Sequence, residues 1–311
     1  MRSVPTASAA AMSGELRVSV VVPVLNGADV IGDLLTSLRH QTSRAAAEVI
    51  VVDNASTDAT VDVVRRFPVA LLSEPRRGPS AARNRGLQHA RGEVVVFLDA
   101  DVLPTRNWLA EMTAPFSDPA LVVAGGRSVD YLPTTPAQRF IAQLGIRQLE
   151  YDFFRGNVPY VAGENMAVRR SALEAVGGWD ESFYTAEDLD LCVRLMRRFD
   201  TLPLRRPHAV LFSRRRSTFD ALFRQAWNYG QGLGRVHLRH PGVIPLDAAR
   251  WSAAASILAA RCAKASLFAC GRTLGWIPPA QAEFARHHWN WSRRFWGGFV
   301  SMLRNREWRP R

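Results

Sequence analysis

Two aspartates flank a single residue directly after an all-apolar run. Residues 94–98 (VVVFL) are followed by Asp99, Ala100 and Asp101. Carboxylates at this spacing can converge on one divalent cation, and their hard oxygen atoms suit Mg²⁺ or Mn²⁺ when phosphate oxygens complete the coordination shell. Ordinary turn residues would show the same spacing, but the position directly after a buried strand favours a metal site. We therefore predict that Asp101, together with Asp99, holds Mg²⁺ or Mn²⁺.

A second acidic pair, Glu187 and Asp188, lies at the start of a predicted helix. A carboxylate in this place can act as a general base. The pair also has a structural explanation, because Thr185-x-x-Asp188 is a capping-box pattern and acids are favoured electrostatically at a helix N-terminus. One residue can fill both roles. We expect Asp188 to be the catalytic base, with Glu187 beside it.

Three further segments carry polar residues after predicted strands or at the start of a helix. They are PVLN at 23–26, DNASTD at 53–58 and GPSAARN at 78–84. Asp53 could accept hydrogen bonds from a base or ribose, or its segment could only build a turn and cap the next helix. Arg83 and Asn84 could face a phosphate or lie on the surface. The candidate ligand-binding residues are Pro23, Asn26, Asp53, Gly78, Arg83, Asn84 and Asp99.

Short β-rich runs alternate with helical patterns over the first hundred residues, which is typical of a parallel sheet with crossover helices. The predicted strands are 18–22, 48–52, 69–72 and 94–98, and the predicted helices between them are 30–38 and 79–91. Ligands of open α/β sheets bind beyond the carboxyl ends of the strands. The sequence therefore predicts an α/β fold in which all these polar segments share one rim of the sheet.

The rest of the chain is predicted to be more helical. Residues 171–176 begin with the capping-box pair Ser171 and Glu174, which indicates a short helix. A longer helix from about Ala186 is apolar on one side, so its first turn can face a cleft, and an amphipathic helix begins near residue 219. The predicted organisation is a disordered leader (1–15), an α/β domain with both acidic pairs (16–215) and a helical, Trp- and Arg-rich region (216–311).

Composition narrows the class of protein. The 311 residues carry a formal charge of +12, and all cations except Lys264 are arginines, which suit phosphates, nucleic acid or anionic lipid. Three cysteines without a CxxC pair indicate neither a disulfide framework nor a zinc site, which favours the cytoplasm. The most apolar stretch, 252–276, is interrupted by Arg261, Lys264 and Arg272. We therefore expect no obvious membrane-spanning segment.

Taken together, these segments resemble the family 2 glycosyltransferases of the GT-A fold over residues 18–199. The similarity rests on the order and spacing of VSVVVPVLNG, EVIVVDNASTDAT, RGPSAARNRG, EVVVFLDAD, AGENMAVRRSALEAVGGWDESF and AEDLDLCVRL. It implies a Rossmann-like, mostly parallel sheet flanked by helices, and inverting transfer of a sugar from a nucleotide-diphosphate donor to an acceptor hydroxyl. By this resemblance Asp53 holds the base, Asp99 the ribose side and Asp101 the metal, and Asp188 is the base of the reaction.

The chemistry of such a transfer assigns the remaining roles. A sugar hydroxyl is a poor nucleophile, so Asp188 would take its proton as the new bond forms. A metal on Asp101 and nearby arginines would stabilise the charge on the leaving diphosphate. Members of the family often carry a histidine after the strand that follows the Glu-Asp helix. Here residues 210–213 (VLFS) occupy that place, which leaves a third protein ligand unassigned.

Other classes of protein share some of these features. A nucleotidyltransferase would need a Gly-rich phosphate loop with a basic residue after the first strand, and VPVLNG has neither. A nucleic-acid-binding protein would suit the positive charge but would leave the acids on the rim unexplained. A nicotinamide dehydrogenase is disfavoured because Gly230-x-Gly232-x-Gly234 follows a helix and not a strand. We expect a nucleotide-diphosphate sugar as the donor and no nucleic acid as a partner.

Tryptophans and arginines alternate near the C-terminus. Indole rings favour the level of the lipid headgroups, and arginines pair with lipid phosphates. We therefore expect this region to dock the protein peripherally on the anionic inner face of the cell membrane, where a lipid-linked or nascent glycan acceptor would lie. The alternative is that the tryptophans pack against the α/β domain or a second subunit. The tryptophans concerned are Trp276, Trp289, Trp291, Trp296 and Trp308.

Overall fold

The computed structural model describes residues 16–42, 47–144, 159–244 and 247–307, so the predicted leader (1–15) and Trp308 lie outside the described residues. The strands are β1 (Val18–Val24), β2 (Ala47–Asp53), β3 (Ala70–Ser73), β4 (Val94–Leu98), β5 (Val102–Pro104), β6 (Val123–Asp130), β7 (Asn165–Arg169) and β8 (Leu204–Ser213). The helices are α1 (Ile31–Arg39), α2 (Thr60–Val64), α3 (Pro79–His89), α4 (Trp108–Thr113), the 3₁₀ turn η1 (Ala114–Ser117), α5 (Pro136–Leu144), α7 (Arg170–Ala175), α8 (Glu187–Phe199), α9 (Phe219–Arg239), α10 (Ala248–Thr273) and α11 (Pro279–Asn305).

The eight strands form one sheet in the order β3-β2-β1-β4-β7-β6-β8-β5. Parallel pairs join β3, β2, β1 and β4, and another joins β6 to β8. The antiparallel strands are β7, which lies between β4 and β6, and β5 at the edge. This arrangement confirms the predicted α/β fold with a mostly parallel sheet.

Both faces of the sheet are covered, and the central strand β4 is therefore fully buried. Val95 and Phe97 pack in a cluster with side chains of α8 and α9, including Leu189 and Leu222. Val94, Val96 and Leu98 pack on the opposite face with side chains of α1 and α4. The continuous apolar run in the sequence therefore reflects burial on two sides, as is usual for central parallel strands.

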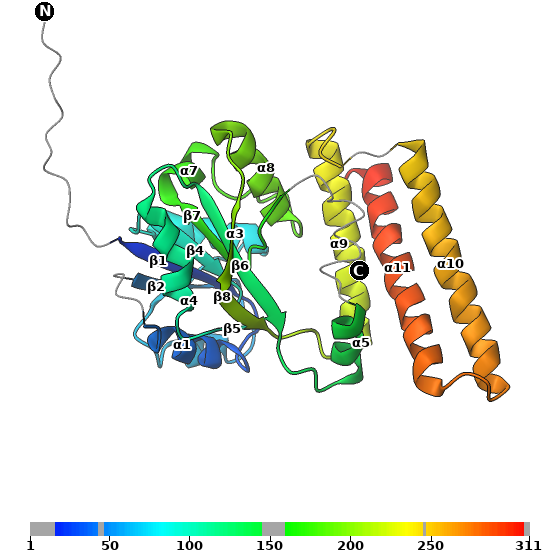
Figure 1. Ribbon diagram of the computed structural model, residues 1–311. Helices are drawn as coiled ribbons and strands as arrows, with labels where there is room; N and C mark the ends of the chain where they lie inside the picture. The colour runs from blue at the N-terminus through cyan, green and yellow to red at the C-terminus, as the bar shows by residue number, and fades with distance from the viewer. Residues whose placement is uncertain (1–15, 43–46, 145–158, 245–246, 308–311) are drawn as a thin grey trace, which may run out of the picture.

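The C-terminal helices α9, α11 and α10 lie side by side in that order beyond the sheet, with α10 outermost (Figure 1). Glycines allow α9 and α11 to approach closely: a Cβ at Gly230 would lie 1.9 Å from the carbonyl O of Phe295, and one at Gly298 would lie 2.0 Å from that of Trp227. A Cβ at Gly232 would lie 2.3 Å from Thr185 Oγ1. The spaced glycines thus serve helix packing and the contact of α9 with the segment before α8.

Both predicted capping boxes are wrong. Helix α7 begins at Arg170, so Ser171 lies inside it, and Glu174 instead pairs with Arg170 at 2.8 Å. At the start of α8, Ala186 is the N-cap in a left-handed conformation and makes no side-chain cap. The hydroxyl of Thr185 donates to the carbonyl O of Asn228 on α9 at 2.7 Å. A tertiary contact has therefore taken up the hydroxyl of Thr185, whereas Glu174 forms a pair within its own helix.

The row of C-terminal tryptophans does not form one exposed face. Trp291 is completely buried and packs edge-on against Tyr229, with the ring centroids 6.5 Å apart. Trp296 is half-buried among Trp251 and Phe299. Trp276, between α10 and α11, is exposed. The expectation of lipid contact is therefore wrong for Trp291, because the amphipathic periodicity of α11 turns it toward the core.

Candidate active site

The ends of β1 and β2 are joined by side chains of the predicted rim. Asn26 has a left-handed backbone (φ 51°), and its Oδ1 accepts a hydrogen bond of 2.8 Å from the backbone N–H of Thr57. The backbone N–H of Asn26 donates to Ser56 Oγ at 2.9 Å. Asp53, which is buried, accepts from the N–H of Ser56 at 3.3 Å. The segments that contain Pro23 and Asp53 therefore form one surface, as the sequence predicted.

Asn54, which sequence reasoning did not single out, connects this surface to α3. Its Oδ1 accepts from the backbone N–H of Gly78 at 2.8 Å, and its Nδ2 donates to the carbonyl oxygens of Glu74 and Arg76. Gly78 has a φ of 141° and immediately precedes Pro79 at the first position of α3. The positive φ explains why glycine stands there, since L side chains rarely adopt it. The third predicted segment is thus fixed beside the first two.

Arg83 connects the two acidic pairs. Its Nη2 donates to Asp99 Oδ1 at 2.8 Å, and its Nη1 donates to Glu187 Oε1 at 2.6 Å. The guanidinium also stacks over the ring of Trp179, 4.6 Å from the centroid, and the side chain is only 3% exposed. Arg83 is therefore not a surface residue, and much of its hydrogen-bonding capacity is used inside the protein.

Asn84 holds the segment before α8 in place. Its Oδ1 accepts from the backbone N–H of Trp179 at 2.8 Å, and its Nδ2 donates to the carbonyl O of Trp179 at 2.9 Å and to Glu181 at 3.0 Å. These two bonds to one backbone orient the Trp179 ring beneath Arg83. The Asn84 side chain therefore has a structural role. The sequence alone had also allowed a contact with phosphate.

Glu187 and Asp188 differ in accessibility. Glu187 is buried and bonded to Arg83, whereas Asp188 is half-buried. Asp188 accepts from the backbone N–H groups of Gly163 and Leu189 at 3.2 and 2.8 Å, which orients its carboxylate without enclosing it. Burial raises the pKa of Glu187 to about 7, with a further rise from Asp188, and outweighs the opposing attraction of Arg83. Asp188 is the member of the pair that a substrate can reach.

Glu164 is a further acid at the rim that was not predicted from the sequence. Because β7 runs antiparallel to β4, Asn165 pairs with Leu98, and Glu164 falls beside the turn that carries Asp101. Ser213 Oγ at the end of β8 donates to Glu164 at 3.1 Å. Desolvation raises the pKa of Asp101 to about 6, with contributions from Asp99 and Glu164. The AGEN segment (162–165) contains this acid, but the sequence does not show that the following strand, β7, runs antiparallel to β4.

The residues at this rim fit a divalent cation. Within the part of the chain that the structure describes, no group of three or more His, Cys, Asp and Glu side chains is arranged to hold a metal without other ligands. Asp99 and Asp101 nevertheless present hard oxygen atoms at a crowded negative centre, where the pKa of Asp101 is raised. A cation would relieve this repulsion, and ligand phosphates could supply the remaining oxygens.

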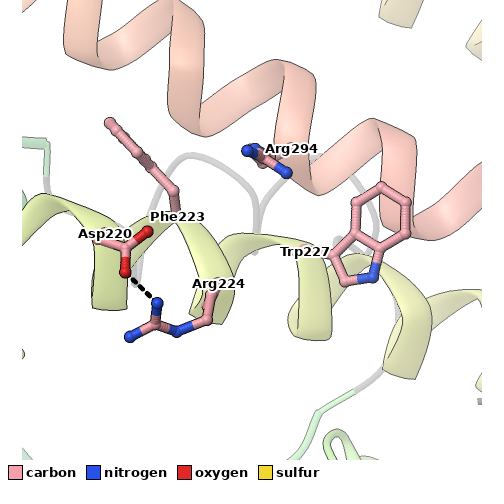
Figure 2. A pocket seen from close by; sticks show the side chains of 5 residues that line it. All are labelled: Asp220, Phe223, Arg224, Trp227 and Arg294. Atoms are coloured by element: carbon pink, nitrogen blue, oxygen red, sulfur yellow. Dashed lines mark hydrogen bonds and ion pairs between the residues drawn. The ribbon is translucent and has the colours of Figure 1, made fainter. Parts of the chain in front are cut away.

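Two surface hollows lie in the C-terminal region of the described residues. One hollow of about 250 Å³ is bounded by α9 and α11, and Figure 2 shows Arg294 and Trp227 beside it, with Arg224 bonded to Asp220. A second, of about 580 Å³, shares Trp227 and is also lined by Trp296, Arg293 and Arg304. Both combine indole rings with guanidinium groups.

The open α/β sheet, with paired acids beyond its strand ends, has the GT-A fold of glycosyltransferases. The sequence pattern of glycosyl transferase family 2 matches residues 19–177. The chain is 34% identical to the pre-mycofactocin glycosyltransferase of Mycobacterium tuberculosis over 72% of its length, and it spans about half (48%) of that relative. It therefore belongs to glycosyl transferase family 2.

Other comparisons agree with this assignment. The succinoglycan biosynthesis protein ExoA of Rhizobium meliloti is 27% identical over 92% of this chain and 96% of its own. A mannosyltransferase of Pyrobaculum calidifontis, solved with GDP-Man and Mn²⁺, has a TM-score of 0.64 at 24% identity over 95% of this chain and 89% of its own. Glucosyl-3-phosphoglycerate synthase of M. tuberculosis, solved with Mn²⁺ and UDP, has a TM-score of 0.54 at 21% identity, covering 75% and 82%. The last two establish the shared fold.

Proposed function

We propose that this protein transfers a hexose from a nucleotide-diphosphate sugar to an acceptor hydroxyl, with inversion, in the synthesis of a cell-surface glycan or glycolipid. The observation that carries the proposal is the Asp99–Arg83–Glu187 bridge, which fixes the donor-side acids next to the first turn of α8, where the half-buried Asp188 lies. The similarity to the succinoglycan biosynthesis protein ExoA supports the acceptor class. We propose residues 16–215 as the catalytic domain and 216–311 as a helical extension.

Each group has a task in this reaction. The surface made by Pro23, Asn26, Asp53 and Gly78 receives the nucleoside, and Asp99 and Asp101 hold Mg²⁺ or Mn²⁺. When bound, the cation supplies Lewis-acid stabilisation of the leaving diphosphate. Asp188 accepts the proton of the acceptor hydroxyl, whose oxygen attacks the anomeric carbon from the face opposite the diphosphate. Such a displacement inverts the anomeric carbon and needs no covalent enzyme intermediate.

The direct test is hydrolysis of UDP-, GDP- and dTDP-sugars by the full chain, with Mn²⁺, with Mg²⁺ and with excess EDTA. We expect one nucleotide class to be hydrolysed slowly in a metal-dependent manner, with faster turnover once an acceptor is added. An Asp188→Asn protein serves as the matched control for contaminating hydrolases. Cleavage by both proteins at one rate, or steep salt-dependent binding of nucleic acid without any cleavage, would contradict the proposal.

The exposure of the outermost helix, α10, is evidence for an acceptor that lies at a membrane. Among the described residues, α10 supplies the one segment, Trp251–Thr273, long and apolar enough to cross a membrane by length and composition, and only 6% of its window is buried. Leu267 and the nearby Trp276 are exposed. Such an exposed apolar surface is costly in water. The sequence analysis expected no obvious spanning segment because of Arg261, Lys264 and Arg272. All three lie within α10, which nevertheless has the length and composition of such a segment.

The occupant that we propose for this face is an anionic membrane surface on the cytoplasmic side, with the protein bound peripherally. Cations line α10, and the larger hollow beside it carries Arg293 and Arg304, so charge complementarity favours lipid phosphates. Exposed tryptophan at the end of α10 suits the headgroup level.

Flotation with vesicles tests the docking. Full-length protein should float with vesicles of phosphatidylcholine and phosphatidylglycerol, less so as salt rises, and less again after Leu267→Glu with Trp276→Ala. Leu202→Glu is the matched control, since Leu202 is equally exposed but lies between α8 and β8. Equal binding to vesicles of pure phosphatidylcholine would contradict an electrostatic contribution to docking. Resistance of the bound protein to alkaline extraction would indicate that α10 spans the membrane. Absence of binding to either kind of vesicle would exclude docking.

A further inference from the structure

Three consecutive arginines, Arg214, Arg215 and Arg216, follow β8 at the rim. The strand before them is fixed to the metal-binding turn, because Ser213 pairs with Val102 across the β5–β8 ladder. The backbone N–H of Arg214 also donates to the carbonyl O of Asp101 at 3.0 Å. The run of arginines is therefore held against the turn that carries Asp101.

Two of these cations are neutralised by other parts of the protein. Arg214 Nη2 lies 2.5 Å from Asp33, and Arg215 Nε lies 2.5 Å from Asp130. The carbonyl O of Arg215 also accepts from Gln138 on α5 at 3.0 Å. These contacts give Arg214 and Arg215 structural roles. The third arginine, Arg216, differs from both.

Arg216 is exposed and forms no ion pair with a carboxylate of the described ranges. Arg216 lies two residues beyond Arg214, whose backbone N–H is bonded to Asp101, and three residues before the start of α9 at Phe219. Its exposed charge therefore stands on the short segment that joins the Asp101 turn to α9.

The charge balance of the rim explains what this cation can do. Asp99, Asp101, Glu164 and Asp188 are all acidic, and the buried Arg83 is already paired with Asp99 and Glu187. A diphosphate adds further negative charge, only part of which a divalent cation would offset. A guanidinium binds phosphate oxygens through two parallel N–H donors and remains charged at all relevant pH values. An exposed arginine at this edge therefore matches a phosphate ligand.

We propose that Arg216 binds the diphosphate of the donor and stabilises the charge that develops on it as the sugar leaves. This inference rests on the proposed function and adds a residue to it. In the transfer, the bond from the acceptor oxygen to the anomeric carbon forms while the bond from that carbon to the diphosphate oxygen breaks. The acceptor proton passes to Asp188, and the electron pair of the broken bond remains on the diphosphate oxygen, beside Arg216.

Inorganic pyrophosphate with Mg²⁺ is a suitable probe, measured by titration calorimetry on the full chain. Arg216→Gln should weaken its binding by about tenfold or more, because a charge-assisted hydrogen bond to the ligand is lost. Arg216→Lys should recover part of the affinity through its charge. Arg224→Gln is the matched control, since Arg224 is an exposed cation on α9 that is bonded to Asp220 (Figure 2).

Binding of Mn²⁺ alone separates a charge effect from a distorted site. Arg216→Gln should leave Mn²⁺ affinity unchanged or higher, because the variant removes a neighbouring positive charge. Unchanged pyrophosphate binding in Arg216→Gln would overturn the proposal, and so would a parallel loss of Mn²⁺ affinity. Neither measurement requires turnover, so absence of glycosyl transfer would count against the proposed function while leaving the binding result intact.

Discussion

Arg83 Nη1 donates a hydrogen bond of 2.6 Å to Glu187 Oε1, across 104 positions of sequence. The other amino group of the same guanidinium reaches Asp99, and the Arg83 side chain is almost completely buried. A buried charge is tolerated only when it is paired and hydrogen-bonded. One residue of α3 therefore connects the start of α8 to the end of β4 and fixes the spacing between Asp99 and Glu187.

Arg83→Lys should lower both stability and turnover. A single ammonium cannot reproduce the planar fork that reaches Asp99 and Glu187 together, so at least one buried acceptor would lose its partner. We expect a loss of about 1–3 kcal/mol in the free energy of unfolding, measured by urea denaturation. Arg85→Lys, two positions later in α3, is the matched control. Equal stability of the two variants would show that the bridge contributes nothing.

Asp188→Asn should reduce turnover by about 10² or more, because the amide keeps the size of the side chain but cannot take a proton. Donor affinity and melting temperature should change little, since Asp188 is half-buried and the amide keeps one oxygen that can accept from the backbone N–H of Gly163 or Leu189. Steady-state kinetics and thermal denaturation check both parts. A larger effect of Glu187→Gln on turnover per folded molecule would mean that the buried acid is the base.

Asp101→Ala should abolish metal-dependent nucleotide binding while the protein stays folded. Burial raises the pKa of Asp101 to about 6, with a further rise from Asp99, so removing this carboxylate should not destabilise the fold. Calorimetric titration of Mn²⁺, with and without nucleotide, measures the loss, and circular dichroism checks the fold. Full turnover of this variant, or of the wild-type protein in excess EDTA, would remove the cation from the mechanism.

Glu187 should make the free energy of unfolding fall as pH rises from about 4.5 to about 7. Its ordinary pKa is 4.5, and burial raises it to about 7 in the folded protein. Between these values the folded state holds a proton that the unfolded chain has released, so raising the pH favours unfolding by at most about 1.4 kcal/mol per pH unit.

The Glu187→Gln variant removes this titration and should give a flatter profile of urea midpoint against pH. Glu174→Gln, at an exposed acid of α7 paired with Arg170, should keep the wild-type slope. Superimposable profiles for the two variants would mean that Glu187 titrates as an ordinary carboxyl.

The strands and the rim were predictable from the sequence because their signals are local. Strand β4 is a continuous apolar run, since both faces of a central parallel strand are buried, and the chain geometry then places Asp99 and Asp101 at its carboxyl end. The turn chemistry of Asn26 and the DNASTD segment likewise depends on residues near strand ends. The order and spacing of these local motifs also carried the family resemblance.

Only the tertiary structure decided which polar groups meet across long sequence separations. Glu164 stands beside Asp101 because β7 is antiparallel, and neither strand direction nor neighbour is encoded in a local pattern. Thr185 bonds to α9 and not to its own helix, since a tertiary partner competes with the local cap. Trp291 is buried where composition suggested a lipid contact. Amphipathic periodicity identifies a face of a helix, but packing determines what that face meets.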